Sequence, residues 1–239
     1  MITAIIPARG GSKSISRKNV VELGGFPLLA YSIAACEMCK GIDRIIVSTE
    51  DEEIAKTAKE YGAEVPFMRP VEFAQDMSTD VDFLRHFFDQ VPVQEAALIR
   101  PTTPFRDPLY MEMVIERYFQ IRDKATGLRT VNEINENPYK VYRLKDNVCR
   151  GFFESFEGKA EYTNLPRQTF PQAYIGNGHI DIVKRETIAL GTTFGNRIYA
   201  EVSEKVIDID SPFDLKIARL EIQENRELLD FLRRRSKNE

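Results

Sequence analysis

Short apolar runs alternate with amphipathic stretches along the first 130 residues, and this pattern predicts strands alternating with helices. The predicted strands are Ile2–Ile6, Asp43–Ser48, Glu64–Met68, Ala96–Ile99 and Gly127–Val131. The predicted helices are Pro27–Lys40, Asp51–Tyr61, Asp80–Asp89, Pro108–Arg122 and, near the C-terminal end, Asp214–Arg235. This order predicts an α/β fold with a Rossmann-like, mostly parallel sheet and helices on both faces.

The alternation breaks between about residues 135 and 174, a segment that holds three prolines and an aromatic cluster. Two strand-like stretches, Val141–Leu144 and Cys149–Phe153, predict a hairpin that projects from the main sheet. Long segments of this kind in compact domains are usually functional or interfacial, although a long ordered loop is the alternative. The sequence therefore predicts one domain over residues 1–239 with a small subdomain inserted at 135–174.

A loop rich in glycine and cations follows the first predicted strand, which stops at Pro7. Its glycines and basic residues are Arg9, Gly10, Gly11, Lys13, Arg17 and Lys18. Glycines let backbone amides approach a ligand, clustered cations suit a polyphosphate, and open α/β sheets bind ligands beyond the carboxyl ends of their strands. The loop matches neither a Walker A motif nor G-x-G-x-x-G. Its position and composition predict a triphosphate site, and the alternative is a basic surface turn.

A second candidate site is the sequence Ile207-Asp208-Ile209-Asp210. On a strand, Asp208 and Asp210 would share one face while Ile207 and Ile209 face the core. Two carboxylates at this spacing suit Mg²⁺, which usually takes one or two carboxylates together with phosphates and waters. The alternatives are an exposed strand edge with two acids, or a capping role for Asp210 or Ser211 at the helix that begins near Pro212. The triphosphate loop earlier in the chain favours the metal interpretation.

Composition narrows the class of protein. With 239 residues, of which 43% are hydrophobic and 29% charged, the chain suits a soluble α/β domain with a full core. A formal net charge of -4 argues against a nucleic-acid binder. No apolar run predicts a membrane span or signal peptide, so we expect a cytoplasmic protein. Cys36 and Cys39 lie on a predicted helix in a chain with only two histidines, and they are predicted to be buried reduced thiols and not zinc ligands.

Five stretches together resemble one family, in the family's order. They are Ile5–Asn19 (I-I-P-A-R-G-G-S-K-S-I-S-R-K-N), Asp43–Val65, Arg69-Pro70, Arg100–Asp107 (R-P-T-T-P-F-R-D) and Val206–Leu215. The chain resembles the acylneuraminate cytidylyltransferase (CMP-sugar synthetase) family, which is similar to the Kdo cytidylyltransferases. The resemblance spans most of the chain, and its first and last motifs are specific.

The resemblance implies that CTP activates a nonulosonic acid of the sialic, legionaminic or pseudaminic type, giving a CMP-sugar and pyrophosphate. The predicted nucleotide-binding residues are Arg9, Gly10, Gly11, Ser12, Lys13, Lys18 and Asn19. Asp208 and Asp210 match the family's Mg²⁺ ligands, and with Arg9 and Lys18 they are the predicted catalytic residues. The resemblance also implies a homodimer whose subunits exchange the 135–174 segment, which closes over the sugar.

The predicted sugar-binding residues are Arg100, Thr102, Lys140, Arg167, Gln168, Asn177, His179 and Asp181. Arg167 resembles the family's sugar-carboxylate arginine. Arg100 stands where sialic-acid members typically carry glutamine, and it has two possible roles: pairing with a ligand carboxylate, or bracing its loop through Asp107. His179 and Asp181 depart from the family's usual alanine and tyrosine, which leaves the exact acid open, and His179 is expected to be a satisfied structural histidine.

Rival functions remain. One is another nucleotidyltransferase, acting on Kdo, an amino-Kdo or a neutral sugar phosphate. The other is a non-catalytic nucleotide-binding protein of the same fold. The paired acids Asp208 and Asp210 argue against the second, because a pure binder needs no metal beside the scissile phosphate.

Overall fold

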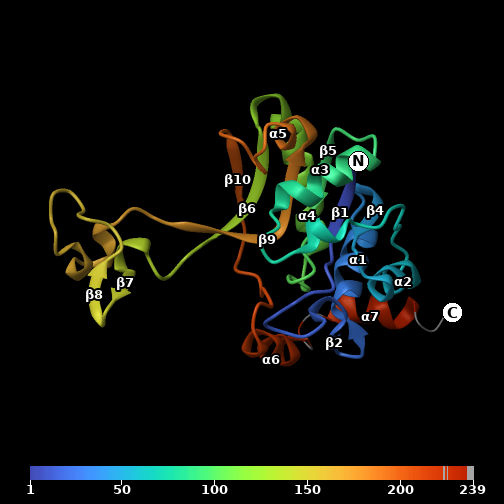
Figure 1. Cartoon of the computed structure of the whole chain (residues 1–239), viewed down its shortest axis with the longest axis horizontal. Helices are drawn as coiled ribbons and strands as arrows, with labels where there is room; N and C mark the ends of the chain where they lie inside the picture. Colours follow the sequence, from blue (N-terminus) through green and yellow to red (C-terminus); the bar gives the residue numbers. More distant parts are fainter. Residues whose placement is uncertain (223, 225, 236–239) are drawn as a thin grey trace.

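The computed structural model describes residues 1–222, 224 and 226–235, and within them six strands form the central sheet in the order β10-β6-β9-β5-β1-β4 (Figure 1). These strands are β1 (Ile2–Pro7), β4 (Ile42–Ser48), β5 (Glu95–Leu98), β6 (Gly127–Glu133), β9 (Tyr174–Lys184) and β10 (Ile198–Val202). Strand β1 runs parallel to β4 and β5, and β10 runs parallel to β6. Strand β9 is antiparallel to both of its neighbours. The prediction of a mostly parallel sheet is confirmed.

Helices cover both faces of this sheet, as predicted. They are α1 (Leu28–Met38), α2 (Glu52–Glu60), α3 (Asp80–Gln90), α4 (Pro108–Ile121), α5 (Arg185–Ala189), α6 (Pro212–Glu221) and α7 (Arg226–Arg235). Successive residues of β1 point to opposite faces: Ala4 and Ile6 pack with α1, α4 and α7, and Ile5 packs with α3 and α5. The predicted buried thiols, Cys36 and Cys39, lie in and just after α1.

Three predicted elements differ in the structure. Of the predicted strand Glu64–Met68, only Glu64 forms a bridge, with Ile46, because Pro66 cannot donate to a sheet ladder. Residues 207–210 form no strand and are attached by the bond from Ile209 N to the Thr102 carbonyl, 2.7 Å.

The predicted C-terminal helix is also different, because two helices, α6 and α7, take its place. Gln223 and Asn225, which lie between them, are outside the described residues. Helix α7 packs Leu228, Leu229 and Leu232 into the core beside α1. Apolar residues recur at helical spacing from Leu215 to Leu232, so the sequence pattern did not separate the two helices.

The segment between β6 and β9 leaves the sheet and forms a projecting arm, residues 135–173 (Figure 1). The predicted hairpin is present as β7 (Tyr142–Lys145) and β8 (Val148–Gly151), joined by Asp146 and Asn147 with φ of 50° and 62°. Two residues with positive φ make the turn that suits a two-residue hairpin. Within the arm the rings of Tyr139 and Phe170 stack, with centroids 5.2 Å apart. The predicted roles of the arm in dimerisation and sugar closure stay predictions.

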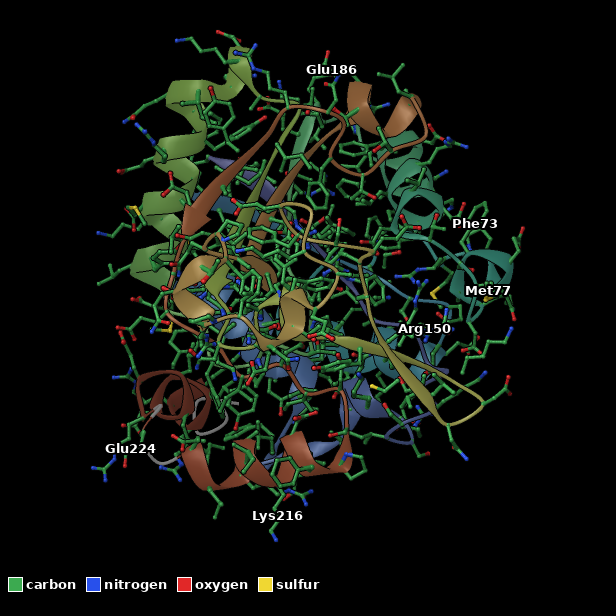
Figure 2. All side chains as sticks on the ribbon, turned by 90° about the vertical axis from the view of Figure 1, so that its left-hand side faces the viewer. Phe73, Met77, Arg150, Glu186, Lys216 and Glu224 are labelled. Atoms are coloured by element: carbon green, nitrogen blue, oxygen red, sulfur yellow. The ribbon has the colours of Figure 1, made fainter. Side chains whose placement is uncertain are left out.

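Arg150 of β8 lies on the arm in front of the molecular body when the structure is viewed from the arm side (Figure 2). Among the helices that the structure describes, none is long and apolar enough to cross a bilayer.

Candidate active site

The predicted cations and acids meet in a cleft of about 400 Å³ beyond the carboxyl ends of β1 and β5. We call it the cationic cleft. The predicted residues that line it are Arg9, Ser12, Lys13, Lys18, Asn19, Arg100, Thr102, Asp208 and Asp210. The rule that ligands bind beyond the carboxyl ends of strands thus locates this cleft correctly.

Lys18 joins the glycine-rich loop to the acidic segment. Its Nζ donates to the Ile209 carbonyl at 3.0 Å and pairs with Asp210 Oδ1 at 2.9 Å, and its side chain is 12% exposed. Ile209 is fully buried, whereas Asp208 and Asp210 on either side of it are exposed and line the cleft. The two acids therefore share a side, as predicted, although no strand forms here.

Capping of the next helix does not require the Asp210 side chain. Ser211 is the N-cap of α6: its Oγ accepts from Asp214 N, and Asp214 Oδ2 in return accepts from Ser211 N at 2.7 Å. This capping box satisfies the first amides of the helix. Of the two predicted capping residues, Ser211 takes the role and Asp210 does not, and the Asp210 carboxylate faces Lys18 and the cleft.

The glycine-rich loop is stabilised by a hydrogen bond of its own and by contacts with residues 75 and 76 on the opposite side of the cleft. Asn19 is buried and its Nδ2 donates to the Arg9 carbonyl at 2.8 Å. Across the cleft, Arg9 Nη1 donates to the Gln75 carbonyl at 3.0 Å and lies 3.6 Å from Asp76 Oδ1, and Lys13 Nζ lies 2.5 Å from Asp76 Oδ2. Arg9 and Lys13 therefore both face an anion in the free protein.

Gly10 is required for packing. A Cβ at this position would lie 2.7 Å from Asp51 Oδ2, and the Gly10 amide donates to Glu50 Oε1 at 2.7 Å. Gly10 and its neighbour Gly11 are not among the residues that line the cleft. Their predicted contact with phosphate stays a prediction, because the Gly10 amide is already bonded here.

Arg69 also lines the cleft. It belongs to the Arg69-Pro70 motif, but the sequence did not predict a place for it in the site. It is 5% exposed, its Nε donates to Ser48 Oγ at 3.0 Å, and its guanidinium lies 4.9 Å from the centre of the Phe83 ring. Burial lowers its pKa to about 10, so Arg69 remains a cation at neutral pH. It adds a fixed positive charge to the cleft wall.

Arg100 is braced, but by a residue other than the predicted one. Its Nη2 and Nη1 lie 2.5 and 3.3 Å from the two carboxylate oxygens of Asp80, at the start of α3. Burial acts to lower the pKa of Arg100, but the hydrogen bond to Asp80 and the charges of Asp80, Asp181 and Asp208 together outweigh it, so the pKa is raised. Asp107 instead caps α4 by accepting from Leu109 N at 2.8 Å. The prediction of bracing through Asp107 was wrong.

Arg106 fixes the turn that carries Arg100 and Thr102, and the sequence reasoning missed it. It is 2% exposed, and its guanidinium donates to side-chain and backbone oxygens on three segments of the chain. The acceptors are His179 O (2.6 Å), Ser32 Oγ (2.9 Å), Gly178 O (2.9 Å), Arg100 O (2.5 Å) and Thr103 O. Arg106 thereby ties residues 100–106 to β9 and to α1. Its place in the R-P-T-T-P-F-R-D motif was the available signal.

The predicted sugar residues of β9 are buried and lie outside the cationic cleft. Asn177 Nδ2 donates to Ser203 Oγ at 2.7 Å, and Asp181 lies 3.6 Å from Arg129. His179 Nε2 accepts from Asp107 N at 3.2 Å, and burial together with nearby Arg106 lowers its pKa to about 4. His179 is a neutral structural histidine, although its Nδ1 has no partner among the described residues.

The remaining predicted sugar residues lie on the arm. Lys140 Nζ donates to the Thr163 carbonyl at 2.7 Å and to the Leu165 carbonyl, so it supports the arm itself. Arg167 and Gln168 are exposed in a short turn far along the arm (Figure 1). A single chain therefore does not bring these three residues to its own cleft.

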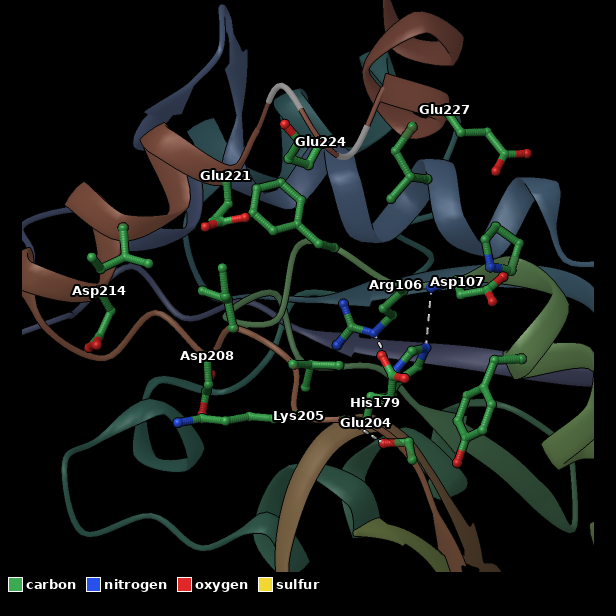
Figure 3. A pocket seen from close by; sticks show the side chains of 18 of the residues that line it. Arg106, Asp107, His179, Glu204, Lys205, Asp208, Asp214, Glu221, Glu224 and Glu227 are labelled. Carbon is green, nitrogen blue, oxygen red and sulfur yellow. Dashed lines mark hydrogen bonds between the residues drawn. The ribbon is translucent and has the colours of Figure 1, made fainter. Parts of the chain in front are cut away.

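A larger cavity of about 1310 Å³ lies on the other side of Asp208, between the start of α4 and helices α6 and α7 (Figure 3). We call it the acidic cavity. Its acidic lining residues are Asp107, Glu204, Asp208, Asp214, Glu221, Glu224 and Glu227. Like charges repel a triphosphate or a sugar acid, so the smaller cationic cleft is the better candidate for both substrates.

Comparison with known proteins identifies the family. The family model described as Cytidylyltransferase matches residues 3–164. The chain belongs to the cytidylyltransferase family. The resemblance predicted from the sequence is thus confirmed.

Relatives of this cytidylyltransferase cover nearly all of it. It is 31% identical over 234 residues to the N-acylneuraminate cytidylyltransferase of Escherichia coli O18:K1:H7. The alignment covers 96% of this chain but only 54% of that relative, so this chain spans about half of the relative's length. It is 32% identical over 247 residues to the CMP-N,N'-diacetyllegionaminic acid synthase of Legionella pneumophila, covering 95% of this chain and 99% of that protein.

The fold of the cytidylyltransferase also matches a solved structure, that of CMP:2-keto-3-deoxy-manno-octonic acid synthetase complexed with CTP. The TM-score is 0.66 at 16% identity, over 93% of this chain and 98% of the other. At this identity the match supports the fold alone.

Proposed function

We propose that this cytidylyltransferase transfers the cytidylyl group of CTP to a hydroxyl group of a nonulosonic, sialic-acid-like sugar, releasing pyrophosphate. The observation that carries the proposal is the convergence of the loop cations with Asp208 and Asp210 on one cleft. The two named relatives, one for an N-acylneuraminate and one for a diacetyllegionaminic acid, support the class of acceptor.

The reaction needs positioning and charge neutralisation more than covalent chemistry. The sugar hydroxyl oxygen attacks the α-phosphorus and loses its proton to solvent, and the bond to the bridging oxygen of the leaving pyrophosphate breaks. Arg9, Lys13 and Lys18 carry the charges that would hold the triphosphate and stabilise the leaving pyrophosphate. Neither histidine of the chain is among the residues that line the cleft, so no histidine base is assigned.

The residues at the mouth of the cleft fit a magnesium ion. Asp208 and Asp210 offer exposed, hard carboxylate oxygens, and Mg²⁺ is commonly bound by one or two carboxylates plus substrate phosphates and waters. No cluster of three or more potential metal ligands occurs in the described part of the chain, which suits a metal completed by the nucleotide. When bound there, Mg²⁺ would neutralise phosphate charge. Lys18 holds Asp210 at this position.

The sugar half of the site is proposed to come from a second copy of the chain. Arg167 and Gln168 are exposed on the arm, away from the cleft of their own chain. The arm also exposes apolar side chains, among them Leu144 (74%), Val148 (53%) and Phe152 (58%). Exposed apolar surface of this kind marks an interaction site. A homodimer would cover it and place Arg167 over the partner's cleft, where a guanidinium suits the sugar carboxylate.

Pyrophosphate release from CTP tests the proposal, with sialic, legionaminic, pseudaminic and Kdo-type acids offered as acceptors in parallel. We expect release with at least one of the first three acids and little with Kdo. Turnover confined to Kdo-type acids would change the assigned acceptor. CTP binding without turnover of any acid would favour a non-catalytic nucleotide-binding protein.

A further inference from the structure

The two loop cations assigned to the triphosphate already have an anionic partner. Asp76 places one carboxylate oxygen 2.5 Å from Lys13 Nζ and the other 3.6 Å from Arg9 Nη1. Asp76 itself lines the cationic cleft. The Lys13 ammonium, bonded to this carboxyl, holds its pKa below the usual range, so Asp76 is ionised at neutral pH. Its carboxylate therefore stands where phosphate oxygens are expected to bind.

Asp76 is held in this position by a closed turn. Ser78 Oγ accepts from Gln75 N and donates to the Glu72 carbonyl, both at 2.9 Å. Ser78 N also donates to the Gln75 carbonyl at 3.1 Å, so the residues on either side of Asp76 are tied together. The next residue, Met77, lies at the outer edge of the molecule and is 90% exposed (Figure 2). Burial of Met77 thus does not fix the turn, and the ion pairs attach it to the loop.

We propose that Asp76 is a specificity-determining residue that occupies Arg9 and Lys13 in the free enzyme and gives them up to ligands that carry several phosphates. A polyphosphate brings several negative charges to both cations at once and replaces the single carboxylate. A nucleoside monophosphate that does not reach both cations gains nothing by displacing it. Asp76 would return to the cations as pyrophosphate leaves. The inference rests on the proposed function only in assigning CTP as the natural ligand.

Calorimetric binding of inorganic tripolyphosphate, CTP and CMP to the wild type and to Asp76→Asn tests this inference. Because exposed ion pairs contribute little, we expect Asp76→Asn to bind tripolyphosphate and CTP about two- to fivefold more tightly at low salt. CMP affinity should not change, and the gain should shrink at high salt. In steady state, the KM for CTP should fall without a rise in kcat.

The matched control is Glu72→Gln, which removes the same charge from the same segment. Glu72 accepts from Ser78 through its backbone only, so its side-chain change leaves the turn intact. Its polyphosphate affinity should match the wild type. Weaker or unchanged polyphosphate binding by Asp76→Asn, or an equal gain for CMP, would overturn the proposal. Binding of tripolyphosphate can be measured without a sugar and without turnover. The comparison therefore tests this inference even if the enzyme activates none of the acids in the panel.

Discussion

At the scale of single residues, the site consists of charges whose partners come from distant parts of the chain. Lys18 and Asp210 meet across 192 positions, and the sequence predicted that both belong to one site because each lies in a recognisable motif. The pair of Arg100 with Asp80 was not predictable in this way. Asp80 is an ordinary first-turn acid of α3, and only the docking of that helix brings it to Arg100.

Lys18→Ala and Arg9→Ala should each weaken CTP binding by about tenfold or more, because a charge-assisted contact in a partly enclosed cleft is lost. Calorimetry measures this directly. The matched control is Arg17→Ala, since Arg17 belongs to the same loop but pairs with Asp51 and Glu53 outside the cleft. Wild-type affinity in both cleft variants, or equal losses in the Arg17 variant, would contradict the assignment of the nucleotide site.

At the scale of elements, the sequence predicted four of the six sheet strands and most helices, but not strands β9 and β10 or the connections that build the cleft. Hydrophobic alternation is a local signal, so it found β1, β4, β5 and β6 within a few residues. It extended a strand through Pro66, although a proline cannot donate to a sheet ladder, and it joined α6 to α7, whose separation depends on tertiary packing. Arg106 is the clearest case: its five acceptors lie on three segments that no local pattern connects.

Arg106→Met should destabilise the fold by at least about 3 kcal/mol, because several buried carbonyls lose their donor at once. Urea unfolding of this variant against the wild type measures the change in the free energy of unfolding. Arg117→Met is the control: Arg117 is half-exposed and pairs with Glu201 at the surface, so we expect a change within about 0.5 kcal/mol. Equal stability of Arg106→Met and the wild type would show that the turn does not depend on this side chain.

At the scale of the whole molecule, the structure separates the two halves of the proposed site. The cations and acids proposed to bind the nucleotide and its metal line one cleft within a single chain, and the predicted sugar residues Lys140, Arg167 and Gln168 lie on the arm. The sequence predicted the insertion and its hairpin from the break in periodicity. How far the arm extends from the body could not be predicted, because hydrophobic periodicity is a local signal and does not report where a segment packs.

Mixing two variants, each impaired in a different half of the proposed site, tests this division. Arg167→Ala should raise the KM for the sugar acid steeply, and Asp210→Asn should remove most turnover. Co-refolded or co-expressed, the two chains should regain about a quarter of wild-type activity, because half of the dimers are mixed and each mixed dimer has one intact site. The controls are the two variants prepared separately in the same way, so that each forms only dimers with itself. No recovery, with a dimer seen by light scattering, would show that the arm serves its own chain.

The most direct test of the central claim is mass-spectrometric detection of the CMP-linked acid after incubation with CTP, Mg²⁺ and the panel of nonulosonic acids. The account predicts that the wild type forms such a product. It also predicts that Asp208→Asn and Asp210→Asn, with unfolding transitions like the wild type's, each form almost none, because an amide lacks the charge that holds Mg²⁺. Near-normal product from both variants, or no CMP-linked acid from the wild type, would contradict the claim that this cleft performs cytidylyl transfer.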